Sequence, residues 1–77
     1  MFTLAKEREA DGALTFHFDA EGETPRRFHA TNAQNGRFVF STDMCRSKER
    51  QPGIPSALEG QSFADRDETV AAVLALN

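Results

Sequence analysis

The strongest constraint on the fold is a set of four short segments in which apolar and polar residues alternate. They cover residues 2–6, 13–19, 26–31 and 37–42, and turn-forming residues separate them. Alternation with a period of two is typical of a strand that has one buried face. Because the joins are short, the sequence predicts an antiparallel meander of four strands.

The faces that the phenylalanines occupy set the register of the last hairpin. A two-residue turn at 35–36 would put Phe40 on the face away from Phe28. A three-residue loop with Gly36 in the left-handed region instead puts Phe40 opposite Ala30. A slip of one residue moves every side chain to the other face, so we expect the second register. One face then holds an apolar set: Phe2, Leu4, Leu14, Phe16, Phe18, Phe28, Phe38 and Phe40.

This apolar face needs a cover, and residues 65–76 supply one. The segment begins with aspartates that suit an N-cap, and acidic residues in a first turn favour the positive end of the helix dipole. The pattern predicts a C-terminal helix whose buried stripe includes Val70, Val73, Leu74 and, at its end, Asn77.

Residues 43–63 form a long connection between the last strand and this helix. Pro52 and Pro55 exclude a long helix there, although residues 55–59 fit one short helical turn. The predicted fold is therefore a single α+β domain over residues 1–77. It is a four-stranded antiparallel β-meander with the C-terminal helix packed on one face.

Composition narrows the class of protein further. The chain has 77 residues, a net charge of −3 and one cysteine, Cys45, so it cannot form an internal disulfide. No apolar run approaches the ~20 residues that span a bilayer, and the opening residues do not resemble a secretion signal. We therefore expect a cytoplasmic protein that does not insert into a membrane.

Residues that often carry chemistry are present, but not in a catalytic arrangement. We expect His17 opposite Arg27 and His29 opposite Thr15, and two diagonal histidines beside an arginine make a poor metal site. Cys45 has no base placed for it, and no glycine-rich phosphate loop occurs. The prediction is a non-enzymatic protein without catalytic residues, metal or cofactor.

The charges are unevenly distributed. Residues 26–50 carry six basic and two acidic side chains, a local net charge of +4, against −7 for the rest of the chain. Such a segment is a candidate surface for an anionic partner. The candidate partner-binding residues are Arg27, Arg37, Arg46, Lys48 and Arg50. The first two lie on strands, where rigid presentation loses less entropy on binding, so we expect them to be the stronger anchors.

Small, acidic, cofactor-free chains often act by occluding a surface on a larger macromolecule. Inhibitors from phages and mobile elements, including anti-CRISPR proteins, are similar in size and composition, and this is an analogy of class. We therefore expect non-catalytic binding to a larger protein or nucleoprotein complex. The alternative is a nucleic-acid-associated module that uses residues 26–50. The phenylalanines are expected in the core and not as a base-stacking surface. Monomer and homodimer both remain open.

Several short pieces of the middle of the chain form a pattern. They are Asn35-Gly36, Val39-Phe40-Ser41-Thr42, Arg46-Ser47-Lys48, and Gly53-Ile54 followed by Ser56. Together with residues 2–6, they resemble one repeat of the YegP-like family of small bacterial proteins. The resemblance implies a unit of three strands, a helix and a strand that pairs with a second copy by swapping the last strand. It implies no catalytic residues, and it adds a dimeric YegP-like protein as a third interpretation.

Overall fold

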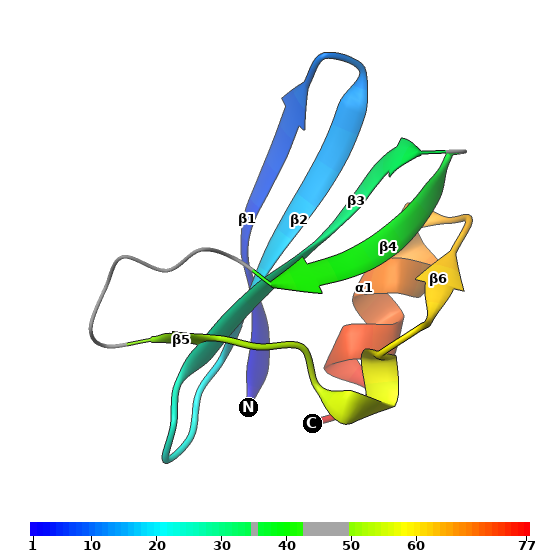
Figure 1. Cartoon of the computed structure of the whole chain (residues 1–77). Helices are drawn as coiled ribbons and strands as arrows, with labels where there is room; N and C mark the ends of the chain where they lie inside the picture. Colours follow the sequence, from blue (N-terminus) through cyan, green and yellow to red (C-terminus); the bar gives the residue numbers. More distant parts are fainter. Residues whose placement is uncertain (35, 43–49) are drawn as a thin grey trace.

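The computed structural model describes residues 1–34, 36–42 and 50–77 (Figure 1). Its elements follow one another along the chain as β1 (Phe2–Ala10), β2 (Ala13–Ala20), β3 (Arg26–Gln34), β4 (Arg37–Thr42), β5 (Gln51–Pro52), the 3-10 turn η1 (Ser56–Leu58), β6 (Ser62–Phe63) and α1 (Arg66–Leu74). The sheet order is β1-β2-β3-β4-β6, and β5 pairs in parallel with β3. The predicted antiparallel meander with one C-terminal helix is confirmed, and two short strands extend it.

The apolar face of the sheet forms the core. Phe16, Phe18 and Phe28 are fully buried, and Val73 of α1 packs into the same cluster. The rings of Phe18 and Phe28 stack with their centroids 5.3 Å apart. The shared face predicted for the phenylalanines is therefore confirmed, whereas Leu4 at the margin of the sheet is 39% exposed.

The β3–β4 hairpin has the expected register over most of its length. Phe40 lies opposite Ala30, as the apolar pattern requires. The extra residue is not in the loop, because Gln34 pairs directly with Arg37. It lies in a bulge of β3 between Thr31 and Gln34. An extra residue in a bulge shifts the pairing by one residue, just as a longer loop does. Phe38 and Phe40 therefore still lie on the same face as Phe28.

The register predicted for the β2–β3 hairpin is wrong by two residues. His17 lies directly opposite His29, and Asp19 lies opposite Arg27. The connection between the paired residues Ala20 and Arg26 is residues 21–25, which is two residues longer than the expected register implies. The observed register stacks Phe18 on Phe28 and forms an ion pair between Asp19 and Arg27, and both interactions favour it.

The first strand is longer than expected, and a bulge changes which of its residues face the core. It runs to Ala10 instead of ending at Lys6. Leu4 lies opposite Phe18, but Lys6 lies opposite the next residue of β2, His17, so Ala5 is an extra residue in a bulge. Asp11 and Gly12 then close the β1–β2 turn with φ values of 53° and 78°, both in the left-handed region. Such a turn matches the twist of the two strands.

Helix α1 begins as the sequence predicts. Asp65 is the N-cap, and its side chain accepts a hydrogen bond of 2.6 Å from the backbone N–H of Asp67. The buried residues of the helix are Thr69 and Val73, whereas Leu74 is 40% exposed and Asn77 is exposed beyond the end of the helix, so the predicted stripe is wrong at both positions. In Figure 1, α1 lies on one side of the sheet, behind β4. No described helix is long and apolar enough to cross a membrane.

Candidate binding face

The side chains that alternate with the core phenylalanines emerge on the side of the sheet opposite α1, and we call this side the open face. Cross-strand pairing defines its members, because paired residues share a face. They are Thr3, Lys6, Arg8 and Ala10 of β1, Ala13, Thr15, His17 and Asp19 of β2, Arg27, His29 and Thr31 of β3, and Arg37, Val39 and Ser41 of β4.

The bulge at Ala5 places two cations on this face. In a regular strand, Lys6 and Arg8 would share the buried face with Leu4, because side chains alternate with a period of two. With Ala5 as an extra residue, Lys6 lies opposite His17 and Arg8 lies opposite Thr15. The residues between and after them, Glu7 and Glu9, are turned toward the side of α1.

The two histidines form a direct cross-strand pair at the centre of the open face. Their ring centroids are 5.7 Å apart, with the ring planes at 45°. Each imidazole lies beside a threonine of its own strand, and the hydroxyl of Thr15 donates a hydrogen bond of 3.1 Å to the hydroxyl oxygen of Thr31. Imidazole and hydroxyl donors thus lie close together on two neighbouring strands.

A shallow cavity of about 270 Å³ lies over these residues. Its lining consists of Arg8, Ala10, Ala13, Thr15, His17, His29 and Thr31. No carboxylate is among the lining residues, so the cavity has donors and one permanent positive charge. Its volume is below that of pockets for drug-sized ligands, which begin at roughly 300 Å³. The cavity therefore has room only for a small group.

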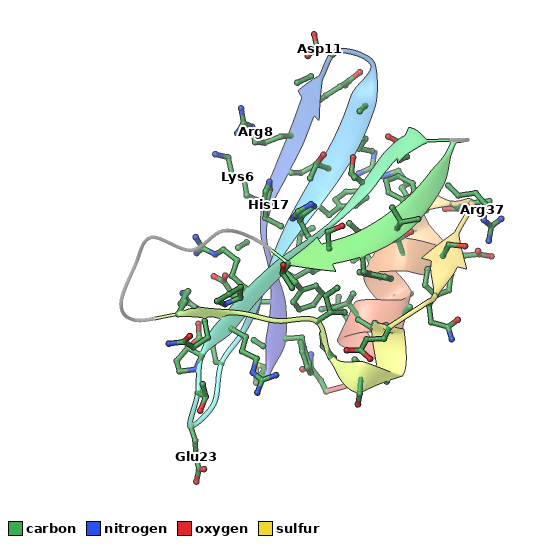
Figure 2. The ribbon with its side chains drawn as sticks, in the orientation of Figure 1. Lys6, Arg8, Asp11, His17, Glu23 and Arg37 are labelled. Carbon is green, nitrogen blue, oxygen red and sulfur yellow. The ribbon has the colours of Figure 1, made fainter. Side chains whose placement is uncertain are left out.

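Lys6 and Arg8 differ from the other cations of the face, because no ion pair joins either of them to an acid within residues 1–34, 36–42 and 50–77. In Figure 2 their side chains extend from β1 on the side away from β2. Unpaired, exposed cations keep their full electrostatic attraction for a partner, since no neighbouring carboxylate offsets it.

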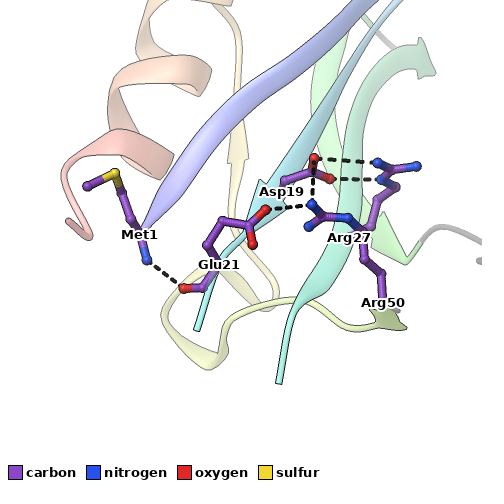
Figure 3. A network of polar contacts seen from close by, with 5 residues as sticks. All are labelled: Met1, Asp19, Glu21, Arg27 and Arg50. Atoms are coloured by element: carbon purple, nitrogen blue, oxygen red, sulfur yellow. Dashed lines mark hydrogen bonds and ion pairs between the residues drawn. The ribbon is translucent and has the colours of Figure 1, made fainter. Parts of the chain in front are cut away.

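Asp19 organises a separate cluster at the other end of the face (Figure 3). Its side chain accepts hydrogen bonds from Nε and Nη2 of Arg27 at 2.8 and 3.4 Å. Nη2 of Arg50 lies 3.7 Å from Asp19 and 2.5 Å from Glu21. The hydrogen bond to Glu21 raises the pKa of Arg50 above its usual value, which keeps this guanidinium charged. The backbone carbonyl of Glu21 also accepts a bond of 2.7 Å from the Met1 amine.

The structure does not gather the predicted partner-binding residues into one patch. Arg27 and Arg50 share the carboxylate of Asp19, which offsets their charge. Arg37 lies at the far end of the β3–β4 hairpin and donates to Oγ and the backbone carbonyl of Ser62 at 3.0 and 2.9 Å. The remaining two, Arg46 and Lys48, lie outside the described residues, as does Cys45.

The sequence reasoning missed Lys6 and Arg8. Their signal is the alternation Lys6-Glu7-Arg8-Glu9, which segregates cations and anions on the two faces of a strand. Which face carries the cations depends on the bulge at Ala5, and the alternation of charges does not reveal that bulge.

Within the described part of the chain, no three histidine, cysteine, aspartate or glutamate side chains form a group that could hold a metal ion. No family model, curated protein or solved structure matches the chain. The geometry of the open face is therefore the basis for any proposal about function.

Proposed function

We propose that this protein is a non-catalytic binding protein that occludes a surface on a larger protein partner, and that the open face is its binding surface. The observation that carries the proposal is the pair of cations Lys6 and Arg8. They lie on β1, which is paired with β2, beside the cavity at His17 and His29, and no described acid neutralises them. Cations on a paired strand suit an acidic patch, since a strand loses less backbone freedom on binding than an unpaired segment does.

A protein partner is favoured over nucleic acid by the position of the aromatic rings. Phe16, Phe18, Phe28 and Phe38 are buried on the side of α1, and the open face as described carries no aromatic ring other than its imidazoles. Binding of single strands relies on stacking of bases on exposed rings. The net charge of −3 also opposes binding to a polyanion without a concentrated basic patch.

The residues predicted from the sequence remain candidates for the rim of this interface. Together with Arg26, they make residues 26–50 the basic part of the chain, with a net charge of +4, which supports the alternative of a nucleic-acid-associated module. These candidates are Arg27, Arg37, Arg46, Lys48 and Arg50. The two hypotheses differ in salt dependence. Log affinity for a duplex falls with log salt with a slope of about −0.9 per phosphate contacted, whereas a protein interface shows a moderate decrease. A YegP-like dimer is the third hypothesis, and the mass of the protein in solution tests it.

The proposed function is tested by capture from a lysate of the native host with three tagged baits. They are the wild type, the Lys6→Ala/Arg8→Ala variant and a control, Gln61→Glu/Ala71→Glu. Both variants change the net charge by the same amount, but Gln61 and Ala71 are exposed residues away from the open face. We expect the wild type and the control to retain the same protein and the Lys6/Arg8 variant to lose it. Equal capture by all three baits would contradict the proposal.

The same baits distinguish the alternative. We expect no binding of a duplex or single-stranded oligonucleotide by the wild type at physiological salt, because the net charge of the chain is −3. A steep salt dependence toward the duplex, or a captured partner that nuclease treatment releases, would favour the nucleic-acid module instead.

A further inference from the structure

β1 is a terminal strand of the sheet, and β2 is its only partner in the part of the chain that the structure describes. One side of its backbone therefore carries N–H and C=O groups that none of the described strands binds. Met1 and Glu21 exchange two hydrogen bonds, of 2.7 and 2.8 Å. Because hydrogen-bonded and non-hydrogen-bonded pairs alternate along an antiparallel ladder, Phe2 and Leu4 direct their backbone groups away from β2.

The directions of the backbone groups of β1 after the bulge can be inferred from β2, because β2 has no bulge in its pairing with β3. Asp19 is two residues before Glu21 and therefore directs its backbone toward β1, and so does His17. The pair of His17 with Lys6 is then hydrogen-bonded, and Glu7 and Glu9 direct their N–H and C=O groups outward. Their side chains lie on the side of α1, while Lys6 and Arg8 stay on the open face.

The chain itself occupies the first of these outward positions. Oδ1 of Asn77 accepts a hydrogen bond of 2.6 Å from the backbone N–H of Phe2, and Nδ2 donates one of 3.1 Å to the carbonyl of the same residue. The carboxamide thus replaces a neighbouring strand at this point. No described residue binds the outward groups of Glu7 and Glu9, so residues 6–10 form an open edge.

The charges on this edge are segregated by face. Lys6 and Arg8 are on the open face, and both extend away from β2, toward the position that an added strand would take (Figure 2). On the other face, Oε1 of Glu7 is already bound by Nη2 of Arg66 at 2.8 Å. Among the described residues of this edge, an incoming strand therefore meets uncompensated positive charge only on the open face.

A second copy of the chain does not fit this edge. In an antiparallel pair of two β1 strands, the same faces adjoin, so Lys6 and Arg8 of one copy would lie opposite the same cations of the other. Like charges directly opposite each other destabilise a sheet. The edge thus selects against self-association and for a segment of opposite charge.

We propose that residues 6–10 of β1 accept an extended segment of a protein partner as an additional strand, with acidic side chains of that segment facing Lys6 and Arg8. The main-chain hydrogen bonds to Glu7 and Glu9 supply affinity, and the acidic side chains supply selectivity. This inference rests on the proposed function and specifies the chemistry of the partner.

The test uses the ¹⁵N-labelled full chain and two blocked peptides as probes. One peptide alternates threonine and glutamate, Thr-Glu-Thr-Glu-Thr-Glu-Thr, and the other has lysine in place of glutamate. We expect the glutamate peptide to slow amide exchange at Glu7 and Glu9, and the lysine peptide to have no effect. A glutamate peptide that fails to bind, or that binds without protecting these two amides, would overturn strand addition.

A matched pair of variants isolates the backbone contact. Glu9→Pro removes the outward N–H, and Glu9→Gln removes the same charge but keeps the N–H. Proline is tolerated on an edge strand where its nitrogen faces solvent, and the amide signals of Phe16 and Val73 report whether the core is intact. We expect Glu9→Pro to weaken binding of the glutamate peptide about tenfold relative to Glu9→Gln. Equal affinities of these two variants would contradict the proposal.

The experiments distinguish a failure of strand addition from a failure of the proposed function. If strand addition is wrong, the protection at Glu7 and Glu9 is absent, but capture of the partner still depends on Lys6 and Arg8. If the proposed function is wrong, the Lys6→Ala/Arg8→Ala bait captures the same partner as the wild type, whatever the peptides do. Should Glu9→Pro fail to fold, the amide exchange of the wild-type chain decides on its own.

Discussion

The side-chain amide of Asn77 binds both backbone groups of Phe2, at 2.6 Å through Oδ1 and at 3.1 Å through Nδ2. These two residues are 75 positions apart in the sequence. The contact joins the residues after α1 to the first strand, and it closes one end of the edge of β1. Val73 packs into the core a few residues earlier, so this part of the chain contacts the sheet at two points.

Replacing Asn77 by alanine should therefore loosen the first strand. A hydrogen bond contributes about 1 kcal/mol net, and this exposed pair should lower the free energy of unfolding by about 1–2 kcal/mol. Asn77→Asp keeps the acceptor for the Phe2 N–H but places an anionic oxygen beside the Phe2 carbonyl, so we expect no rescue. Amide exchange at Phe2 measures the effect. Unchanged exchange in Asn77→Ala would show that the contact does not hold the strand.

The register of β2 and β3 can be tested by crosslinking. Asp19 and His17 direct their backbones toward β1, so the pair of His17 with His29 is non-hydrogen-bonded, with an expected Cα separation of about 4.5 Å. Disulfides span about 4.4–6.8 Å between Cα atoms. In a Cys45→Ser background, His17→Cys/His29→Cys should form an intramolecular disulfide on mild oxidation, detected as a mass loss of two hydrogens.

The control for this crosslink is His17→Cys/Arg27→Cys in the same background. It places cysteines at the positions that a register shifted by two residues would make neighbours. We expect it to remain reduced under conditions in which the 17–29 pair oxidises. The opposite ranking of the two variants would mean that the strands pair in the shifted register.

The positions of the apolar residues made most of the fold predictable. Phe16, Phe28 and Phe40 fix the faces of three strands, and Asp65 followed by acidic residues marks the start of α1. Bulges and loop lengths were not predictable, because an extra residue leaves no apolar signal where polar residues occupy both faces. The bulge at Ala5 is such a case, and it determines that Lys6 reaches the open face.

The candidate site was less predictable for the same reason. Local charge identified Arg27 and Arg50, but the ion pair of Arg27 with Asp19 depends on a hairpin register that is two residues from the expected one, and that of Arg50 depends on where the chain returns to β3. Whether a cation is available to a partner depends on which acids lie across the sheet from it. That information resides in the pairing of strands and not in the density of charge along the chain.

The core should tolerate truncation poorly. Phe16 is fully buried and packs against the ring of Phe38 at a centroid distance of 5.4 Å. Phe16→Ala should lower the free energy of unfolding by about 3–5 kcal/mol. Val39→Ala is the control, since Val39 is 38% exposed on the open face and should cost well under 1 kcal/mol. Chemical denaturation of both variants measures the difference. Similar losses in the two variants would mean that the buried face is wrongly assigned.

The Asp19 cluster should contribute to stability more than to binding. Asp19 is only 9% exposed and has two arginines as partners. We expect Asp19→Asn to cost about 1.5–3 kcal/mol, as for hydrogen bonds to charged groups, and Arg27→Gln to cost less, because Arg50 remains near the carboxylate.

Arg27→Glu should be the most destabilising change in this cluster, because it places a second carboxylate opposite Asp19. Urea denaturation of the three variants ranks them. A fully stable Arg27→Glu variant would show that the ion pair is not formed in solution, and it would restore Arg27 as an anchor available to a partner.

The affinity of the captured partner for purified variants tests the central claim most directly. Titration calorimetry should give a dissociation constant for Lys6→Ala/Arg8→Ala that is at least about tenfold weaker than for the wild type. The control, Gln61→Glu/Ala71→Glu, has the same net charge as this variant but keeps the open face. Its affinity should stay within about twofold of the wild type, since salt screens exposed charges that are far from the interface. Equal weakening by both variants would mean that net charge alone governs binding, and no weakening by the Lys6/Arg8 variant would place the interface away from the open face.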